Sequence, residues 1–260
     1  MIRREENGST WLIHQTAHAY IAGQIAEHWV GTQRAFHEPR QELWLAAVTH
    51  DAGWTAIEQC PRINGQGKPR SFTEMDRDEH FAIWHNSIQA TYTQNRYAGL
   101  LTSKHCSELY EQRLLYIDDT AETKARIKEF LIERHAWENS LIASLREHPR
   151  YGPAVAPERL AENLRLLQVW DYLSLLLCMS TVRENVIEDV PLRAGQRDVL
   201  YVAGSGARGM VLEPFPLDQP LTIWIDARQL NRSQFESDDD LRAALAEAPY
   251  KPLAFELGPL

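Results

Sequence analysis

The chain is poor in cysteine and in basic charge. Its three cysteines, Cys60, Cys106 and Cys178, are isolated and form no C-x-x-C pair, which is typical of free thiols and argues against a cysteine-based zinc site. Lysine and arginine total 27 residues against 36 aspartate and glutamate residues, which gives a formal charge of −9 at pH 7. This balance argues against a dedicated nucleic-acid or membrane surface, although it leaves room for a local basic pocket that binds a phosphorylated small molecule.

Long apolar runs are also missing. The first ten residues lack the apolar core of a signal peptide. The most apolar stretch, residues 164–180, is interrupted by Arg165, Gln168 and Asp171 and therefore predicts a buried helix rather than a membrane span. We expect a cytoplasmic protein with no nucleic-acid or membrane partner.

Helical spacing of apolar residues dominates the first part of the chain. Residues 16–30 and 39–51 each carry this spacing, and each segment is followed by a glycine that can end a helix. After about residue 191, short β-branched or aromatic runs alternate with Gly, Pro and Asp, as in strands. We therefore expect a mainly α fold, with a helical metal-binding domain over residues 1–190 and a small α+β appendage over residues 197–260 packed on it.

The strongest chemical signal is the adjacent pair His50-Asp51, which ends an apolar helix. Neighbouring side chains on a helix point about 100° apart, so both reach one ion mainly where the helix is ending, and Gly53 supplies that end. An imidazole nitrogen and a carboxylate oxygen suit Zn, Mn or Fe, and the carboxylate can bridge two ions. The pair predicts one or two divalent metal ions as cofactor.

A second signal is the aspartate in the apolar stretch. Asp171 shares one helical stripe with Leu164, Leu167, Leu175 and Cys178, so its carboxylate should face the core. An ionised carboxylate that is buried without a partner is too costly, so it must be protonated, paired or bound to metal. We interpret Asp171 as a metal ligand.

Histidines supply the remaining candidate ligands. His18 lies in the pattern H-x-x-I-A-x-x-I-A, whose small residues permit close helix packing, and His14 is its rival on the same helical face. His85 and His105 lie on two successive predicted helices, with His80 as the rival of His85. We prefer His18, His85 and His105.

The order His18, then His50-Asp51, then Asp171 resembles the HD-domain superfamily of metal-dependent phosphohydrolases. The resemblance covers roughly residues 14–180. It implies a helical bundle in which the first histidine, the pair and the late aspartate hold one metal ion. The H-D-x-G-W motif is similar to that of one bacterial family within this superfamily.

The same resemblance implies a second metal ion. His85 and His105 match the extra histidines of dinuclear HD proteins, with Asp51 as the ligand that bridges the two ions. Their spacing, with a helix break between them, also resembles the di-iron oxygenase branch of the superfamily.

One departure from the HD pattern concerns the substrate. Many members have a lysine where this chain has Trp54, and that lysine neutralises a substrate phosphate. Lys104 is our candidate for this catalytic role, with Arg96, Lys68 and Arg70 as alternatives.

These residues support three hypotheses. The first is an HD-type metal-dependent hydrolase that attacks a phosphorylated small-molecule substrate with metal-activated water, which Asp51 orients as a catalytic residue. The second is an HD-type di-iron oxygenase, and the third is a non-catalytic metal- or ligand-binding module. Glu58 and Glu74 are weaker candidates for a general base.

Overall fold

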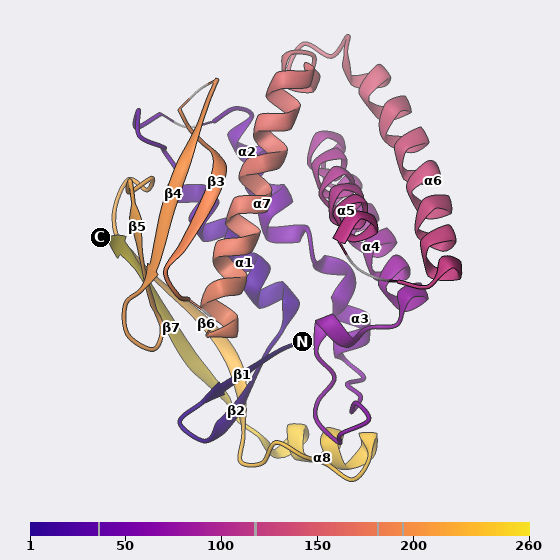
Figure 1. Cartoon of the computed structure of the whole chain (residues 1–260), viewed down its shortest axis with the longest axis vertical. Helices are drawn as coiled ribbons and strands as arrows, with labels where there is room; N and C mark the ends of the chain where they lie inside the picture. Colours follow the sequence, from indigo (N-terminus) through magenta and orange to yellow (C-terminus); the bar gives the residue numbers. More distant parts are fainter. Residues whose placement is uncertain (36, 117–118, 181, 194) are drawn as a thin grey trace.

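The computed structural model describes residues 1–35, 37–116, 119–180, 182–193 and 195–260. The helices are α1 (Gln15–His28), α2 (Arg40–Thr49), α3 (Thr55–Glu58), α4 (Arg77–Tyr92), α5 (Arg96–Tyr116), α6 (Ala121–Leu145), α7 (Pro157–Met179) and α8 (Asp238–Glu247). The strands are β1 (Ile2–Glu6), β2 (Ser9–Ile13), β3 (Asn185–Arg193), β4 (Gln196–Gly204), β5 (Gly209–Glu213), β6 (Leu221–Leu230) and β7 (Tyr250–Pro259). The strands form one sheet that curls around α1 and α7, while α4, α5 and α6 lie further from the sheet (Figure 1).

The sheet is mixed and has the strand order β1-β2-β6-β7-β5-β4-β3. β5 and β7 run parallel, and the other neighbouring strands pair antiparallel. Along β6, Leu221, Ile223 and Ile225 are buried, whereas Trp224 between them is exposed. This period of two is typical of a sheet with one covered face, and α1 and α7 contact that sheet from within the curl.

The first two strands form a hairpin at one edge of the sheet. Asn7 and Gly8 join them with φ values of 52° and 75°. Two successive positive φ values match a type I′ turn, whose twist suits a two-residue hairpin and for which Asn-Gly is the preferred sequence. The turn sets the register, in which Ile2 pairs with Ile13 and Glu6 with Ser9.

The expected fold class, a mainly α helical bundle with a small C-terminal β appendage, is wrong. The chain is about 52% helical and also builds a large seven-stranded sheet, so it is an α/β protein. Two strands come from the first thirteen residues. Their Asn-Gly sequence is typical of a hairpin turn, but the sequence prediction did not include this hairpin. In addition, β3 begins at Asn185, so strands from both sides of the expected domain boundary pair with each other as β3 and β4.

Close packing of α1 on α2 depends on a glycine. A Cβ atom placed on Gly23 would lie only 2.0 Å from Cγ1 of Val48, so no larger residue fits unless the helices separate. Ala19, Ala22 and Ala26 are also buried on α1. Small residues thus bring the backbone of α1 against α2, and this approach places His18 near the end of α2.

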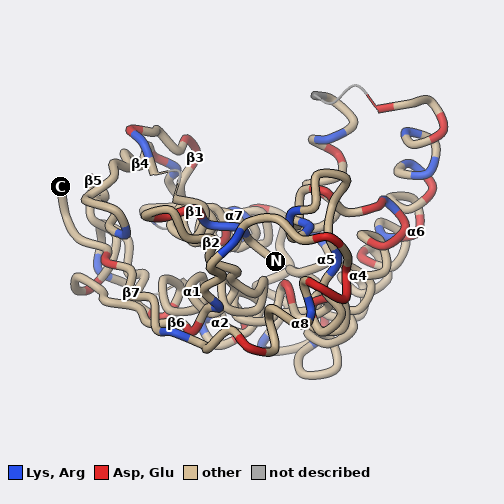
Figure 2. Tube along the Cα trace, turned by 90° about the horizontal axis from the view of Figure 1, so that it is seen from below, with Lys and Arg blue, Asp and Glu red and all other residues tan. Residues whose placement is uncertain are grey.

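Charge is mixed over the helical part of the molecule. Acidic and basic residues are interspersed along α4, α5 and α6 (Figure 2). Among the helices of the described residues, none combines the length and apolarity that crossing a membrane requires.

A buried arginine ties the sheet to α7. The Arg4 side chain is fully buried, and its guanidinium donates to the carbonyl oxygens of Leu177 and Ala207, both at 2.6 Å. Its Nε atom lies 2.7 Å from a carboxylate oxygen of Glu6, which compensates the buried charge. A cation at the C-terminus of a helix satisfies the last carbonyls and interacts favourably with the helix dipole.

We therefore predict that Arg4→Met destabilises the protein by about 3 kcal/mol, because it leaves the carbonyl oxygens of Leu177 and Ala207 without their donor and leaves Glu6 with Arg208 alone. Urea denaturation followed by circular dichroism measures the loss. Arg3→Met is the matched control, since Arg3 pairs with Glu74 at the surface and should cost less than about 1 kcal/mol. Equal losses in the two variants would contradict the structural role of Arg4.

Candidate metal centre

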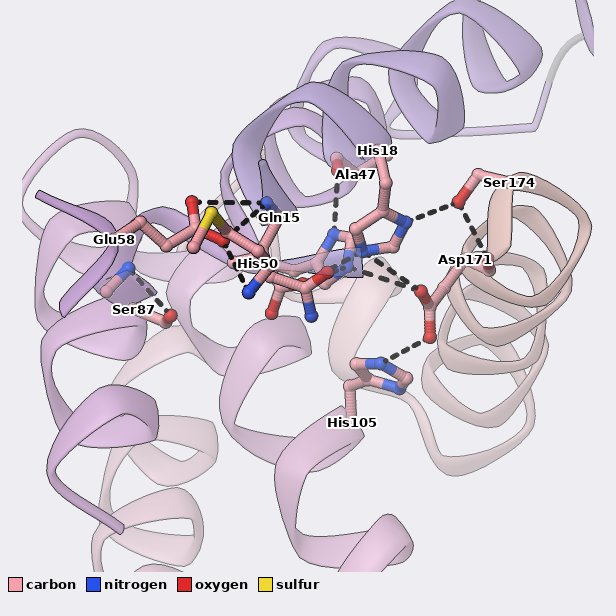
Figure 3. Close-up of polar contacts among 12 residues, drawn as sticks. Gln15, His18, Ala47, His50, Glu58, Ser87, His105, Asp171 and Ser174 are labelled. Atoms are coloured by element: carbon pink, nitrogen blue, oxygen red, sulfur yellow. Dashed lines mark hydrogen bonds and ion pairs between the residues drawn. The ribbon is translucent and has the colours of Figure 1, made fainter. Parts of the chain in front are cut away.

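Five ionisable side chains from four helices meet in the core (Figure 3). α1 contributes His18, the end of α2 contributes His50 and Asp51, α5 contributes His105 and α7 contributes Asp171. The three histidines are 0–2% exposed.

The helix break predicted after Asp51 is present as a 3₁₀ turn, Ala52–Trp54. The backbone N–H of Gly53 in this turn donates to Ser87 Oγ at 2.9 Å, which fixes the turn against α4.

The hydrogen bonds of His18 determine which of its nitrogens faces the centre. Ser174 Oγ donates to the carbonyl oxygen of Asp171 at 2.7 Å, so its own oxygen is left to accept a hydrogen bond. His18 Nδ1 lies 2.7 Å from Ser174 Oγ, so Nδ1 carries the hydrogen of this bond. In the neutral ring Nε2 then presents a lone pair, 2.8 Å from Asp51 Oδ2. Two acceptors this close call for a cation between them.

His50 is arranged in the same way. Its Nδ1 lies 2.8 Å from the carbonyl oxygen of Ala47, which can only accept a hydrogen bond, so Nδ1 is the donor. Its Nε2 is buried and has no hydrogen-bond partner among the described residues. That atom lies 3.4 Å from Asp171 Oδ1 and 3.7 Å from Asp51 Oδ2. Holding one ring nitrogen by a hydrogen bond while the other points at a shared centre is the usual arrangement of a metal-binding histidine.

The spacing of these atoms suits a bound ion. The four distances from the Nε2 atoms of His18 and His50 to Asp51 Oδ2 and Asp171 Oδ1 run from 2.8 to 3.7 Å. Ligands bound at about 2.1 Å lie roughly 3.0 Å apart at right angles and about 3.4 Å apart at tetrahedral angles. The residues therefore fit a divalent cation, and their nitrogen and oxygen donors suit Zn, Mn or Fe.

Asp171 reaches a second group of ligands. Its Oδ2 lies 3.2 Å from Nε2 of His105, while its Oδ1 faces His50. His50, His105 and Asp171 could hold an ion together, as could His18, His50 and Asp51. His50 is the residue common to the two groups, and Asp51 and Asp171 each belong to one of them, whereas the sequence pattern assigned the bridging position to Asp51.

The charges of the centre are strongly coupled. Burial alone would lower the pKa of His50, but Asp51 and Asp171 outweigh it and raise this pKa to about 9. Burial would raise the pKa of Asp171, yet the neighbouring rings of His105 and His50 hold it well below its usual range. The pKa of Asp51 is likewise lowered, against the effect of burial, by His50 and His18. In the metal-free protein, the proton on His50 compensates part of the charge of the carboxylates.

A cavity of about 480 Å³ opens onto these residues. Trp54, Phe72 and Trp84 form an aromatic part of its lining. Arg77 and Arg113 also line it and bring positive charge to the same space. Neither arginine was predicted from the sequence, because nothing in the local sequence around them indicates that α4 and α5 bring them beside the candidate metal ligands.

The structure separates the two histidine alternatives on α4. His85 is exposed and lies outside the cavity, so the structure does not bring it to the other candidate ligands. His80 lines the cavity, and its Nδ1 lies 2.5 Å from the hydroxyl oxygen of Tyr110. Burial lowers the pKa of His80 to about 4. The sequence could have indicated this, because helical spacing places His80 on the same face as the buried residues Trp84 and Ser87.

His14, the rival of His18, serves a different purpose together with Glu58. Its Nδ1 lies 2.9 Å from Glu58 Oε2. The same carboxylate accepts the backbone N–H of Gln15 at 3.0 Å, at the first turn of α1. A carboxylate at this position satisfies a free N–H group and favours the helix dipole. Glu58, a weak candidate for a general base, is thus engaged in holding the start of α1.

The lysine chosen to bind substrate phosphate points elsewhere. Lys104 Nζ lies 3.6 Å from Glu138 Oε2 on α6, and Lys104 does not line the metal cavity. Of the alternatives, Arg70 pairs with Glu79 at 2.8 Å and Arg96 donates to Ser144, and neither they nor Lys68 line the cavity. The other weak candidate for a general base, Glu74, does line it.

A family model described as "protein of unknown function (DUF3891)" matches residues 1–232. The chain belongs to the DUF3891 family. No curated protein and no solved structure matches it. The DUF3891 match runs from β1 through β6 and so includes both the helices and most of the sheet.

This family assignment corrects the resemblance to the HD-domain superfamily. That resemblance rested on the order of a few histidines and aspartates, and it implied a helical bundle. The DUF3891 chain instead curls a seven-stranded sheet around its central helices. Histidines and aspartates on packed helices can meet in many folds, so their order alone did not identify the family.

We predict that the metal-free protein binds about one Mn, Zn or Fe(II) ion per chain tightly, and that His50→Ala weakens this binding at least a hundredfold. The reason is that His50 belongs to both ligand groups. Calorimetric titration with each metal measures the affinity. His85→Ala is the matched control and should bind metal as the wild type does, because His85 is exposed outside the cavity. Unchanged binding in His50→Ala would refute the centre.

Metal uptake should also release a proton. The pKa of His50 is raised to about 9, so this ring is protonated at pH 7 in the metal-free protein, and a metal ion must displace that proton. The apparent affinity should therefore rise about tenfold per pH unit between pH 7 and 9 and level off above pH 9. Calorimetry in two buffers of different ionisation enthalpy counts the released protons. An affinity independent of pH over this range would contradict the assignment.

Proposed function

We propose that the protein is a metal-dependent hydrolase that acts on a phosphorylated small molecule. The observation that carries this proposal is the buried group of His18, His50, Asp51 and Asp171, in which the Nδ1 atoms of both histidines are engaged and both Nε2 atoms face the two carboxylates. One or two divalent ions would be the cofactor. Such a centre supplies a nucleophilic hydroxide near neutral pH, since coordination lowers the pKa of water.

Two arginines in the cavity support an anionic substrate. Arg77 has a buried Nε atom with no hydrogen-bond partner among the described residues, so a donor is left for a ligand. The guanidinium of Arg113 is oriented by Asp119 through two hydrogen bonds of 2.7 and 2.8 Å. An oriented guanidinium suits the paired oxygens of a phosphate. These residues take the place of the lysine that the sequence pattern lacked.

His80 is suited to hold a substrate or water by a hydrogen bond. Its pKa of about 4 keeps the ring neutral at pH 7, so it adds no charge to the cavity and exchanges hydrogen bonds rather than protons. Burial raises the pKa of Tyr110, whose hydroxyl therefore stays protonated beside His80 Nδ1. His80 lines the same cavity as Arg77, and the ring of Tyr110 lies against the Arg77 guanidinium, so a phosphate held by Arg77 would lie beside the His80 ring.

An oxygen-dependent reaction at the same centre is the second candidate. The observation that favours it is the presence of two adjacent groups of ligands, which share His50 and could hold two iron ions. Hydrolysis needs no dioxygen, whereas an oxygenase does. Parallel assays with and without oxygen separate the two candidates.

We predict that the metal-loaded protein hydrolyses p-nitrophenyl phosphate or another phosphomonoester equally well in air and under nitrogen. Asp51→Asn should abolish the activity, because this carboxylate belongs to the metal-binding group. Arg77→Gln should raise KM about tenfold while leaving kcat within a few-fold, since it removes a contact that binds substrate and transition state alike. His85→Ala should keep wild-type activity. Turnover that requires oxygen, or its absence across a phosphomonoester panel in a metal-loaded protein, would overturn the hydrolase.

A further inference from the structure

A second cavity lies away from the metal centre, where α2 and α7 begin. Its volume is about 380 Å³. Three arginines from different parts of the chain line it: Arg150 after α6, Arg159 in the first turn of α7 and Arg193 at the end of β3. We call this space the arginine cavity. Most of the remaining lining is apolar (Val30, Ala35, Pro39, Pro153, Ala154 and Leu192), and Gln33, His37 and Glu38 complete it.

Buried carboxylates hold two of these arginines in place. Arg150 donates to both carboxylate oxygens of Glu42, at 2.8 and 3.0 Å. Arg159 donates to Glu162 at 2.9 Å. The carboxylate side chains are 6% and 10% exposed, whereas the two arginine side chains are 51% and 37% exposed. A molecule entering the cavity therefore meets the guanidinium groups and not their acidic partners.

Several guanidinium donors are left for a ligand. Arg193 uses its Nε atom on Thr32 Oγ1, and the described ion pairs give it no carboxylate. Arg159 uses only Nη1 in the described hydrogen bonds. The one acidic residue in the lining, Glu38, turns a carboxylate oxygen towards the backbone N–H of Arg40 at the start of α2. Fixed guanidinium groups with free N–H donors are suited to phosphate and carboxylate oxygens.

The arginine cavity is distinct from the metal centre. On α7, Arg159 precedes Asp171 by twelve residues, which is about 18 Å along a helix. The two cavities share no lining residue. An anion bound in one therefore cannot touch the ligands of the other.

We propose that the arginine cavity binds a small oxyanion-bearing metabolite, with its phosphate or carboxylate groups on Arg159 and Arg193 and its apolar part on the prolines and Leu192. The volume is within the range of small-molecule sites. The proposal is independent of the hydrolase activity, because it involves none of the residues of the metal centre.

Calorimetric titration of the metal-free protein tests this site. The probes are inorganic phosphate, pyrophosphate and citrate, and removal of metal prevents their binding at a metal ion. Pyrophosphate or citrate should bind saturably with one molecule per chain. Arg193→Gln and Arg159→Gln should each weaken binding at least tenfold, and Arg193→Lys should restore part of the loss.

Two controls locate the binding. Arg62→Gln and Arg126→Gln each remove an exposed arginine that pairs with a carboxylate outside both cavities, Glu79 and Asp78 respectively. Both should bind the probes within twofold of the wild type, and thermal melting verifies that every variant is folded. Binding of pyrophosphate alone identifies a phosphate ligand, and binding of citrate alone identifies a carboxylate ligand. No saturable binding by the wild type, or a loss in Arg62→Gln or Arg126→Gln as large as in Arg193→Gln, would overturn the proposal.

Discussion

The burial of two carboxylates in one place is the constraint on which the site depends. Asp51 and Asp171 have side chains only 8% and 14% exposed. Each would cost several kcal/mol if buried without compensation, and together they repel. Among the described residues the imidazoles of the centre lie nearest to them, and the two carboxylates in turn raise the pKa of His50, which therefore holds a compensating proton. A divalent cation provides the same compensation with fewer protons, which is the physical argument for a metal centre.

The sheet and the helix packing hold the two carboxylates together despite the free-energy cost of burying them. Arg4 joins the hairpin of β1 and β2 to the end of α7, the helix that carries Asp171. Ser174, one turn further along α7, orients His18 across the interface with α1. Gly23 lets α1 approach α2 closely enough for His18 to reach Asp51. The β strands, absent from the helical bundle that was expected, therefore anchor the helix on which the carboxylate is mounted.

Local patterns in the sequence predicted the components of the site better than the fold. A polar residue on an apolar stripe identified Asp171 as a buried group, and a helix end next to a histidine identified His50-Asp51. The Asn-Gly turn of the first hairpin and the buried helix face that contains His80 are also local patterns, so both could have been predicted from the sequence. The meeting of Arg77 and Arg113 could not be predicted, because it depends on the tertiary packing of α4 on α5. The family also required a comparison over the whole chain, since a few spaced histidines occur in unrelated folds.

The direction of α2 relates the two cavities electrostatically. Its N-terminus begins at Arg40, beside the arginine cavity, and its C-terminus leads into His50. A helix carries partial positive charge at its N-terminus and partial negative charge at its C-terminus, each effect amounting to about 0.3–1 kcal/mol. The same helix thus favours an anion at the arginine cavity and a cation at the metal centre. α7 starts at the arginine cavity too but passes the candidate metal centre at mid-helix, so there it contributes side chains such as Asp171 and Ser174 and no terminal charge.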